Sequence, residues 1–195
     1  MKKLKCILVL MFVSISLFGQ SFGNEFNFSV RATTINNIGE LKEMWETGSA
    51  IYISYENMSF TQFSYMFQTG YINYMQNENY EFEGSDPYFN IIPIQVGGRY
   101  YILTDWIRPF LMAMTGVNIV NSKYALMPDE ENTGNDEYSG TNIKLNFQVG
   151  LGLAVKLISN LQLEVLANYN SHVLDAPTHY NITGLEVGIG LNWRM

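Results

Sequence analysis

Residues 142–157, NIKLNFQVGLGLAVKL, alternate strictly between large apolar side chains and small or polar ones. Successive side chains of a β-strand point to opposite faces, so a period of two over this length predicts a strand and excludes an amphipathic helix. Strands of soluble domains cluster near about 5–6 residues, whereas a strand that crosses a bilayer needs about 9–11. The run is long enough to cross a bilayer, so its apolar face could meet either a protein core or lipid, and the rest of the sequence has to distinguish the two.

Six other segments alternate in a similar way, and with residues 108–122, which are apolar on both faces, the sequence predicts eight strands. The pattern does not assign the faces of residues 108–122, and Leu166 breaks the alternation of its own segment. The predicted strands cover residues 26–34, 48–57, 59–75, 89–103, 108–122, 141–157, 160–172 and 183–195.

The connections between these strands alternate in length. Short ones lie near residues 57–58, 104–106 and 159–160, and long ones cover 35–47, 76–88, 123–140 and 173–182. Such alternation is typical of an antiparallel up-and-down barrel with short turns at one end and long loops at the other. A closed barrel also leaves no strand edge unpaired, as lipid requires. The sequence thus predicts one all-β domain over residues 24–195.

The first 23 residues read as a secretory signal peptide. Lys2, Lys3 and Lys5 precede an apolar segment over residues 6–18, and Ser21 and Gly23 stand at the −3 and −1 positions of a cleavage site. Cleavage after residue 19 and a retained anchor are the alternatives. The single cysteine of the chain, at position 6, lies within this segment, so no disulfide or thiolate metal site is expected in the mature fold.

The charge of the mature chain argues against a nucleic-acid partner. The sequence has 11 Lys and Arg and 18 Asp and Glu, and three of the lysines lie in the predicted signal, which leaves 8 against 18, or −10. A nucleic-acid surface needs the opposite sign. No stretch beyond the signal approaches the length of about 18 apolar residues that a transmembrane helix needs.

Two kinds of eight-stranded barrel share this alternation with opposite polarity. A lipocalin-like barrel is soluble and apolar inside, whereas a membrane barrel is apolar outside. The face opposite the leucines is small and carries Gly150, Gly152, Gly188 and Gly190, which suit a narrow, crowded interior. Together with the signal peptide, this polarity predicts a transmembrane barrel whose leucine face meets lipid.

Aromatic residues near the predicted strand ends support the same conclusion, because aromatic girdles lie at both bilayer interfaces of membrane barrels. Trp106, Tyr100 and Trp193 are expected at the level of the short turns. The residues expected toward the long loops are Tyr71, Tyr74, Tyr88 and Tyr169.

The segments IPIQVGGRYYI, RPFLMAMTGV, FQVGLGLAVKL and VGIGLNWRM resemble the small OmpA/OmpX-type outer-membrane β-barrel proteins over nearly the whole mature chain. The resemblance implies an outer-membrane location. It also implies a C-terminal assembly signal, made here by Gly190, Trp193 and Met195, that the barrel-insertion machinery reads. Met195 departs from the terminal aromatic of the family, and Gly188 replaces its usual polar residue. No peptidoglycan-binding domain is expected after the barrel.

Eight charged residues are expected to face the lumen. Buried charges need partners, so we expect Lys144 or Lys156 to pair with Glu164 and Glu186 on neighbouring strands. Eight strands leave little room beyond side chains, which favours a structural plug over a narrow ion or solute path. The predicted lumen charges are Arg31, Glu56, Arg99, Lys144, Lys156, Glu164, Glu186 and Arg194.

The predicted long loops are acidic. They suggest a solvated outer surface, or contact with divalent cations that bridge lipopolysaccharide, or with a basic partner. The run DEENTGND is rich in oxygen ligands but lacks the spacing of a calcium loop, so no metal or other cofactor is predicted. The acidic residues are Glu40, Glu43, Glu46, Glu78, Glu81, Glu83, Asp86, Asp129, Glu130, Glu131, Asp136, Glu137 and Asp175.

The two histidines raise an enzymatic alternative. Ser171, His172, Asp175 and His179 lie close together at one barrel mouth, as in small barrels that modify lipid A. A nucleophile needs a hydrogen-bonded base and an orienting carboxylate, but Ser171 and His172 point to opposite faces if both are in a strand. The sequence therefore predicts a monomeric, non-enzymatic outer-membrane barrel with a structural or adhesive role, whose partners are outer-membrane lipids, lipopolysaccharide and the insertion machinery. A narrow channel or transporter is the first alternative and a lipid-A-modifying enzyme the second.

Overall fold

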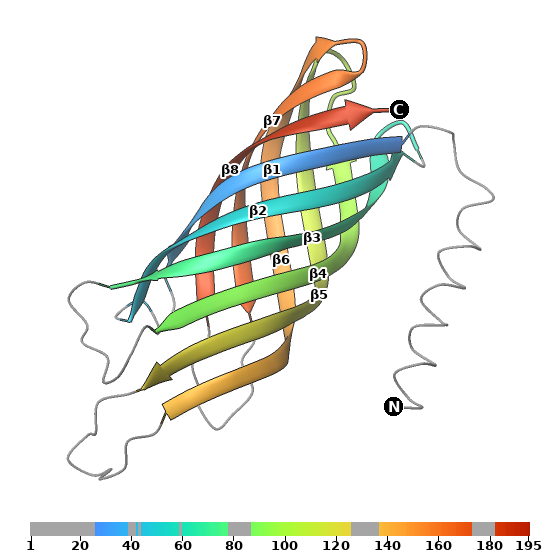
Figure 1. The fold of residues 1–195 in the computed structure, drawn as a ribbon. Helices are drawn as coiled ribbons and strands as arrows, with labels where there is room; N and C mark the ends of the chain where they lie inside the picture. Colours follow the sequence, from blue (N-terminus) through green and yellow to red (C-terminus); the bar gives the residue numbers. More distant parts are fainter. Residues whose placement is uncertain are drawn as a thin grey trace, which may run out of the picture.

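The computed structural model describes residues 26–38, 42, 44–58, 60–77, 87–125, 137–172 and 182–195. They form one closed barrel in which each strand pairs antiparallel with its neighbours in sequence and the last strand pairs with the first, as Figure 1 shows. The predicted eight-stranded, antiparallel up-and-down barrel is confirmed. The strands are β1 (Phe26–Asn37), β2 (Trp45–Met58), β3 (Phe63–Gln76), β4 (Tyr88–Tyr101), β5 (Ile107–Ala125), β6 (Glu137–Ile158), β7 (Leu161–His172) and β8 (Ile182–Arg194).

The largest difference from the predicted boundaries is the length of the β5–β6 hairpin. Its ladder continues to the pair Ala125 and Glu137, beyond the predicted ends of both strands. Residues 123–125 and 137–140 are KYA and EYSG, which contain no row of large aliphatic side chains, so the hydrophobic pattern does not detect this extension. Among the described residues, no helix has the length and apolar character needed to cross a membrane.

The strands are strongly tilted relative to the barrel axis. From Gly188, ladder partners lead in one direction to Val120 on β5 and in the other direction to Phe110 on the same strand. Val120 and Phe110 are ten residues apart, so the pairing register advances by ten residues around the barrel. Closing a sheet with such a stagger requires tilted strands, which are visible in Figure 1.

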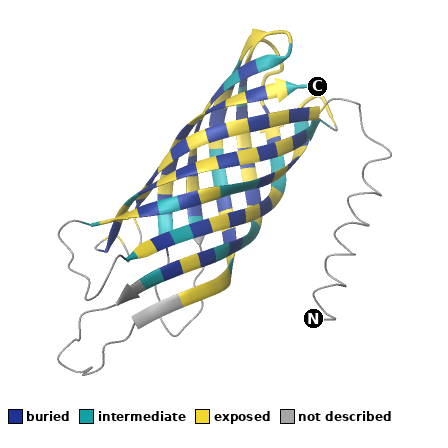
Figure 2. Cartoon of the chain, in the orientation of Figure 1, coloured by how far each residue is buried: buried dark blue, intermediate teal, exposed yellow. Residues whose placement is uncertain are grey.

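Each strand buries every second side chain, and Figure 2 shows the resulting chequered wall. The large apolar side chains of β6 and β8 face outward, with Leu151 61% and Val187 60% exposed, while the charged residues Arg99 and Glu164 face inward and are fully buried. This polarity is the reverse of that of a soluble barrel, and it is the polarity of a transmembrane barrel.

Glycine permits a close approach of two strands at the middle of the wall. A Cβ atom at Gly97 on β4 would collide with the carbonyl oxygen of Ala113 on β5, and one at Gly116 on β5 would collide with the carbonyl oxygen of Ile94 on β4. Glycine within strands marks such close backbone contacts. The ladder between β4 and β5 therefore depends on the absence of side chains at these two positions.

We expect Gly97→Val to lower the free energy of unfolding by about 1–3 kcal/mol, as overpacking typically does. The added side chain has to displace backbone atoms of β5. Urea titration of the protein folded in lipid vesicles measures the change. The control is Gly98→Ala, whose new methyl group meets mainly the far edge of the Phe63 ring, at 2.7 Å. Equal midpoints for the two variants would contradict the backbone explanation.

Candidate functional site

The barrel interior is the candidate site, and its end near the long loops is filled by apolar side chains. We call these residues the upper cluster. Tyr74 and Trp45 pack against Phe89 there, with ring centroids 5.7 and 5.6 Å from its ring. The upper cluster comprises Ile35, Met44, Trp45, Ala50, Tyr52, Ile72, Tyr74, Phe89, Ile91, Val120 and Ile182.

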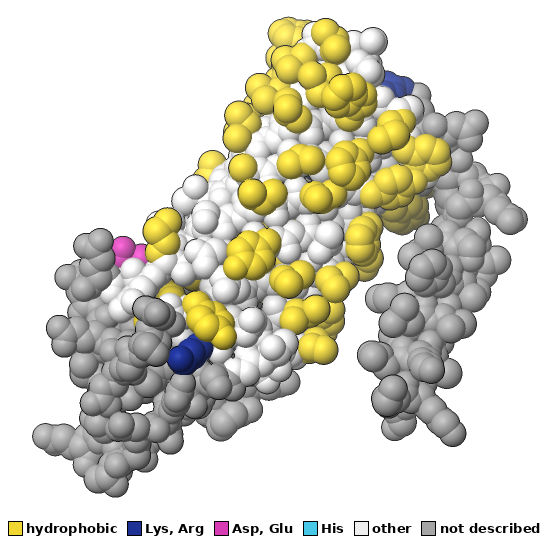
Figure 3. Space-filling view, in the orientation of Figure 1, with side chains coloured by type: hydrophobic (Ala, Val, Ile, Leu, Met, Phe, Trp, Pro, Cys, Tyr) yellow, Lys and Arg dark blue, Asp and Glu magenta, His cyan; other side chains and the backbone are white. Residues whose placement is uncertain are grey.

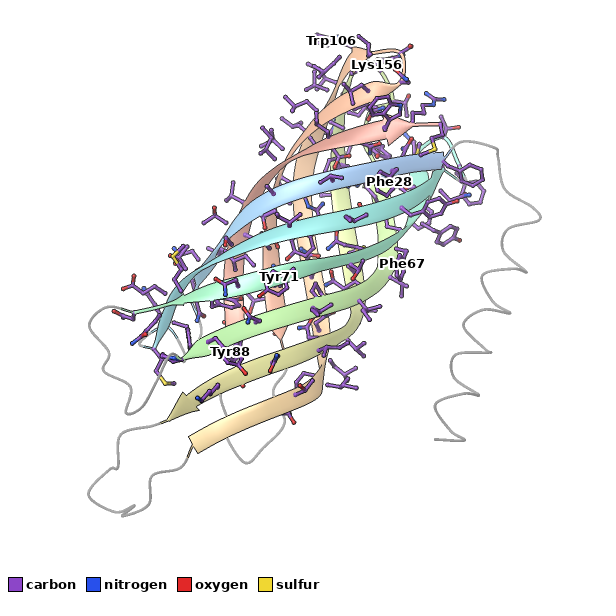
Figure 4. The ribbon with its side chains drawn as sticks, in the orientation of Figure 1. Phe28, Phe67, Tyr71, Tyr88, Trp106 and Lys156 are labelled. Carbon is purple, nitrogen blue, oxygen red and sulfur yellow. The ribbon has the colours of Figure 1, made fainter. Side chains whose placement is uncertain are left out.

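The placement of Tyr74 in the outer aromatic girdle was therefore wrong. Its side chain is only 3% exposed. Tyr71 faces outward, and Tyr74 lies three residues further along the same strand, so the alternation turns its ring inward. The other predicted girdle residues are exposed, as Figure 4 shows for Tyr71, Tyr88 and Trp106.

A second apolar group, the lower cluster, lies toward the short turns. It assigns the faces of β5, where Phe110, Met112 and Met114 point inward and Leu111 points outward. It also explains the exception at Leu166, which is buried in the same cluster. The lower cluster comprises Met66, Tyr101, Phe110, Met112, Met114, Ala154 and Leu166.

A buried ion-pair cluster, the Arg99 cluster, adjoins the lower cluster. Arg99 donates to both carboxylate oxygens of Glu164, at 2.6 Å from Nη1 and 3.2 Å from Nη2, and its Nη1 lies 3.3 Å from Glu56 Oε2. Tyr101 donates its hydroxyl to Glu56 at 2.9 Å, and Asn192 donates to Glu164 at 2.8 Å. A bidentate pair with satisfied lone pairs is the geometry in which buried charges are tolerated.

Aromatic rings cover the Arg99 cluster. The Arg99 guanidinium lies 4.1 Å from the centroid of the Phe110 ring. Arg108 lies 3.9 Å from the centroid of the Tyr101 ring and is 93% buried, since its relative exposure is 7%. Cations over ring faces are attracted by the ring quadrupole, more strongly where water is excluded.

A second polar group occupies the middle of the barrel. Arg31 donates to Gln68 Oε1, and Gln68 Nε2 donates to Gln95 Oε1 at 2.8 Å. Glu186 accepts from Gln148 at 3.0 Å and from Asn170. These bonds join strands β1, β3, β4, β6, β7 and β8 across the lumen, so the interior is held by side chains as well as by the ladder.

Of the eight predicted lumen charges, the structure buries five: Arg31, Glu56, Arg99, Glu164 and Glu186. Lys144 and Arg194 are half-buried near opposite ends of the barrel. The predicted pairing of Glu164 with a lysine was wrong, because Arg99 takes that position. Nor does Lys156 point into the lumen.

Lys156 is exposed because it lies beyond the rim at the short-turn end, where Figure 4 labels it beside Trp106. Its backbone amide donates to the Trp106 carbonyl at 2.9 Å. The pairing of β6 with β7 shifts its register between Lys156 and Ile158, so the alternation ends there. Lys156, Leu157 and Ile158 are consequently all exposed.

The sequence prediction missed Arg108. The buried lumen charges then comprise the arginines Arg31, Arg99 and Arg108 and the glutamates Glu56, Glu164 and Glu186, three of each sign. Arg108 has the same parity as Phe110 and Met112, so its position follows once the faces of β5 are known.

Several predicted residues lie outside the described part of the chain. These are residues 1–23 with the predicted signal, most of the acidic loop residues, and Asp175 and His179; the side chain of His172 is likewise outside it. Ser171 is described, lies on the outer face of β7 and is half-buried. No group of three or more His, Cys, Asp or Glu side chains suited to a metal ion occurs among the described residues.

No protein-family model matches the chain, and no curated protein matches it. Solved structures do. Neisserial surface protein A matches at a TM-score of 0.60 and 15% identity, over 88% of this chain and 99% of that one. Ail, the attachment invasion locus protein of Yersinia pestis, matches at 0.55 and 14%, over 88% and 98%.

A major outer membrane protein of Thermus thermophilus matches at a TM-score of 0.57 and 11% identity, over 87% of this chain and 99% of that one. These identities are low, so the matches concern the fold. The closed order of the strands, the outward leucine face and the three matches agree: the chain has the fold of the small eight-stranded outer-membrane β-barrels.

Proposed function

We propose that this protein is a non-enzymatic outer-membrane barrel with a structural or adhesive role. The observation that carries the proposal is the polarity of the wall, with leucine, isoleucine and valine outside and three arginines and three glutamates inside. A wall of this kind is stable in lipid, because acyl chains offer no hydrogen bonds, whereas the strands pair their backbone groups with each other and turn these six charged side chains inward. Water would favour the reverse arrangement.

The lumen is proposed to be a plug rather than a path. The two apolar clusters and the two polar groups together occupy the lumen, and Gln68, Arg99 and Glu186 within them have no exposed surface. Side chains fill the interior of an eight-stranded barrel of this size. Moving an ion past this point would require breaking the Arg99–Glu164 pair, in which both side chains are fully buried.

An adhesive role would belong to the long-loop end of the barrel. The structural match Ail is described as an attachment invasion locus protein, and one of its structures holds a heparin analogue, sucrose octasulfate. The loop segments of this chain are acidic rather than basic. A basic partner, or divalent cations that bridge lipopolysaccharide, therefore suits this chain better than a sulfated sugar.

The C-terminal residues Gly190, Trp193 and Met195 are proposed as the signal read by the barrel-insertion machinery, and the inserted barrel is proposed to be a monomer. Trp193 and Met195 face outward and are exposed, while Gly190 faces inward beside Arg31. An outward row on the last strand is accessible to a membrane-bound receptor before the barrel closes.

The first test is the mobility of the detergent-extracted protein in SDS gels, unboiled and boiled, followed by conductance in planar bilayers. A heat-dependent mobility shift together with a silent bilayer is expected. A protein that is soluble without detergent would overturn the membrane proposal, and steady conductance would favour the channel alternative. Lipid-A mass spectra that change with the intact protein and not with His172→Ala or His179→Ala would favour the enzyme.

A further inference from the structure

Small polar side chains form an unbroken row across the outer wall, which we call the polar row. Each member is the direct ladder partner of the next, from β1 to β6. Two of them also bond on the outside of the barrel, where Asn73 Nδ2 donates to Asn90 Oδ1 at 2.7 Å. The polar row comprises Thr34, Ser49, Asn73, Asn90, Asn121 and Thr141.

The polar row rises obliquely toward the long loops. A ladder of paired residues runs perpendicular to the tilted strands. We use the term level line for a line of constant height along the barrel axis. With a ten-residue stagger over eight strands, the level line falls below the ladder by about 1.25 residues at each strand from β1 toward β8. Three strands from Ser49, the level line therefore meets β5 about four residues below Asn121, at Val117. At equal height, β2 presents a serine to the outside and β5 presents a valine.

The length of the outward apolar span differs accordingly between the β1–β2 side and the β5–β6 side of the barrel. On β2 the outward apolar residues are Ile51, Ile53 and Tyr55, bounded by Ser49 and Asn57. On β6 every outward residue from position 143 to position 155 is apolar, up to the rim where the alternation ends. A strand needs about 9–11 residues to cross a bilayer, so positions 50–56 are too few and positions 143–155 are more than enough.

The space-filling view agrees with this difference. Figure 3 presents the face made mainly by β1 to β4, where hydrophobic side chains gather toward the end at which the C-terminus lies and become sparser toward the long loops. Beyond the polar row, the exposed apolar side chains include Ile38, directly after β1, and Met75 and Tyr88, which continue the register of the ladder pair Tyr74 and Phe89.

We propose that the lipid-facing belt is a wedge, narrow at β1–β2 and wide at β5–β6, and that the bilayer beside β1–β2 is locally thinned. The inference rests on the proposed membrane location. Acyl chains offer no hydrogen-bond partner to the hydroxyl groups of Thr34 and Ser49 or to the amides further along the row, whereas a bilayer adapts its thickness to a short apolar span at a small cost per ångström. The occupant of the narrow side is therefore lipid whose headgroups lie lower than those beside β6.

The test places a nitroxide spin label at one position at a time in the full chain carrying Cys6→Ser, reconstituted in dioleoyl phosphatidylcholine vesicles. The labelled variants are Ser49→Cys and Val117→Cys, which lie at equal height. Collision rates with oxygen, which concentrates among acyl chains, and with a water-soluble nickel chelate report depth. We expect a several-fold higher ratio of oxygen to nickel collisions at Val117 than at Ser49.

A matched control pair lies within the belt on both sides. The ladder from Ile53 passes Thr69 and Ile94 to Val117, and the level line falls about four residues lower, at Ala113. Labels at Ile53 and Ala113 should report the same acyl depth.

The outcomes separate the wedge from the membrane location itself. Equal ratios at Ser49 and Val117, with both control labels in the acyl layer, would overturn the wedge and leave the barrel in the membrane. High nickel collision rates at Ile53 and Ala113 would overturn the proposed location. A Ser49 label shielded from both reagents would identify a second copy of this chain in place of lipid on the narrow side, and would overturn the proposed lipid contact there.

Discussion

Replacing Arg99 with Met is expected to lower the free energy of unfolding by about 3–5 kcal/mol, the cost of leaving buried carboxylates without their cation. Glu164 and Glu56 both accept from Arg99, and neither is exposed by more than 2%. The methionine also gives up the contact of the guanidinium with the Phe110 ring. Urea unfolding of the barrel in lipid vesicles, followed by tryptophan fluorescence, measures the change.

The cause can be separated from the loss of side-chain volume. A triple variant with Arg99→Met, Glu56→Gln and Glu164→Gln removes the unpaired charges and should recover much of the stability. The matched control, Lys156→Met, deletes a charge predicted for the lumen but found beyond the rim, and should change stability by no more than about 0.5 kcal/mol. If Arg99→Met were as mild as Lys156→Met, the ion pairs would not be what holds this level of the barrel.

Leu151→Arg is expected to cost about 2–4 kcal/mol in a bilayer. Leu151 is 61% exposed and lies in the middle of the apolar run of β6. In a soluble barrel the same change would exchange an exposed leucine for a hydrated arginine, with an effect within about 0.5 kcal/mol. The same vesicle unfolding assay measures it.

The control for Leu151→Arg is Thr141→Arg on the same strand. Thr141 also faces outward but belongs to the polar row, where a charge reaches water, so the expected cost is about 0–1 kcal/mol. Equal and negligible costs at both positions would show that the leucine face does not meet hydrocarbon.

The strands, their order and most of their faces were predictable because a period of two is a local property of the sequence. The inward or outward orientation of side chains was left unassigned on β5 and was wrong at Lys156, because the two-residue period does not distinguish inside from outside at these places. On β5 both faces are apolar, because Phe110 and Met112 fill the lumen while Leu111 meets the outside. At Lys156 the alternation continues in sequence past the rim of the barrel, where it no longer separates inside from outside.

The ion pairs were less accessible to sequence reasoning for a geometric reason. Arg99 on β4 meets Glu56 on β2 and Glu164 on β7, strands that are not its ladder neighbours. Pairing across a lumen depends on shear and on the height of each residue, and neither follows from local pattern. The sequence therefore pointed to Lys144 or Lys156, on a strand close to Glu164, as the partner of that carboxylate, although it also predicted Arg99 in the lumen.

The pairing of β1 with β8 has a kinetic consequence. Every other ladder joins strands that are consecutive in the chain, but this one joins residues such as Arg31 and Gly190, which are separated by most of the sequence. Long-range pairing of this kind is slow, because chain entropy is lost before the contact forms. Until β8 docks, β1 and β7 each present a row of free amides and carbonyls to any passing strand. We therefore expect the nascent sheet to be vulnerable to mispairing until its final thirteen-residue strand arrives, and we expect closure of the barrel to be a late step.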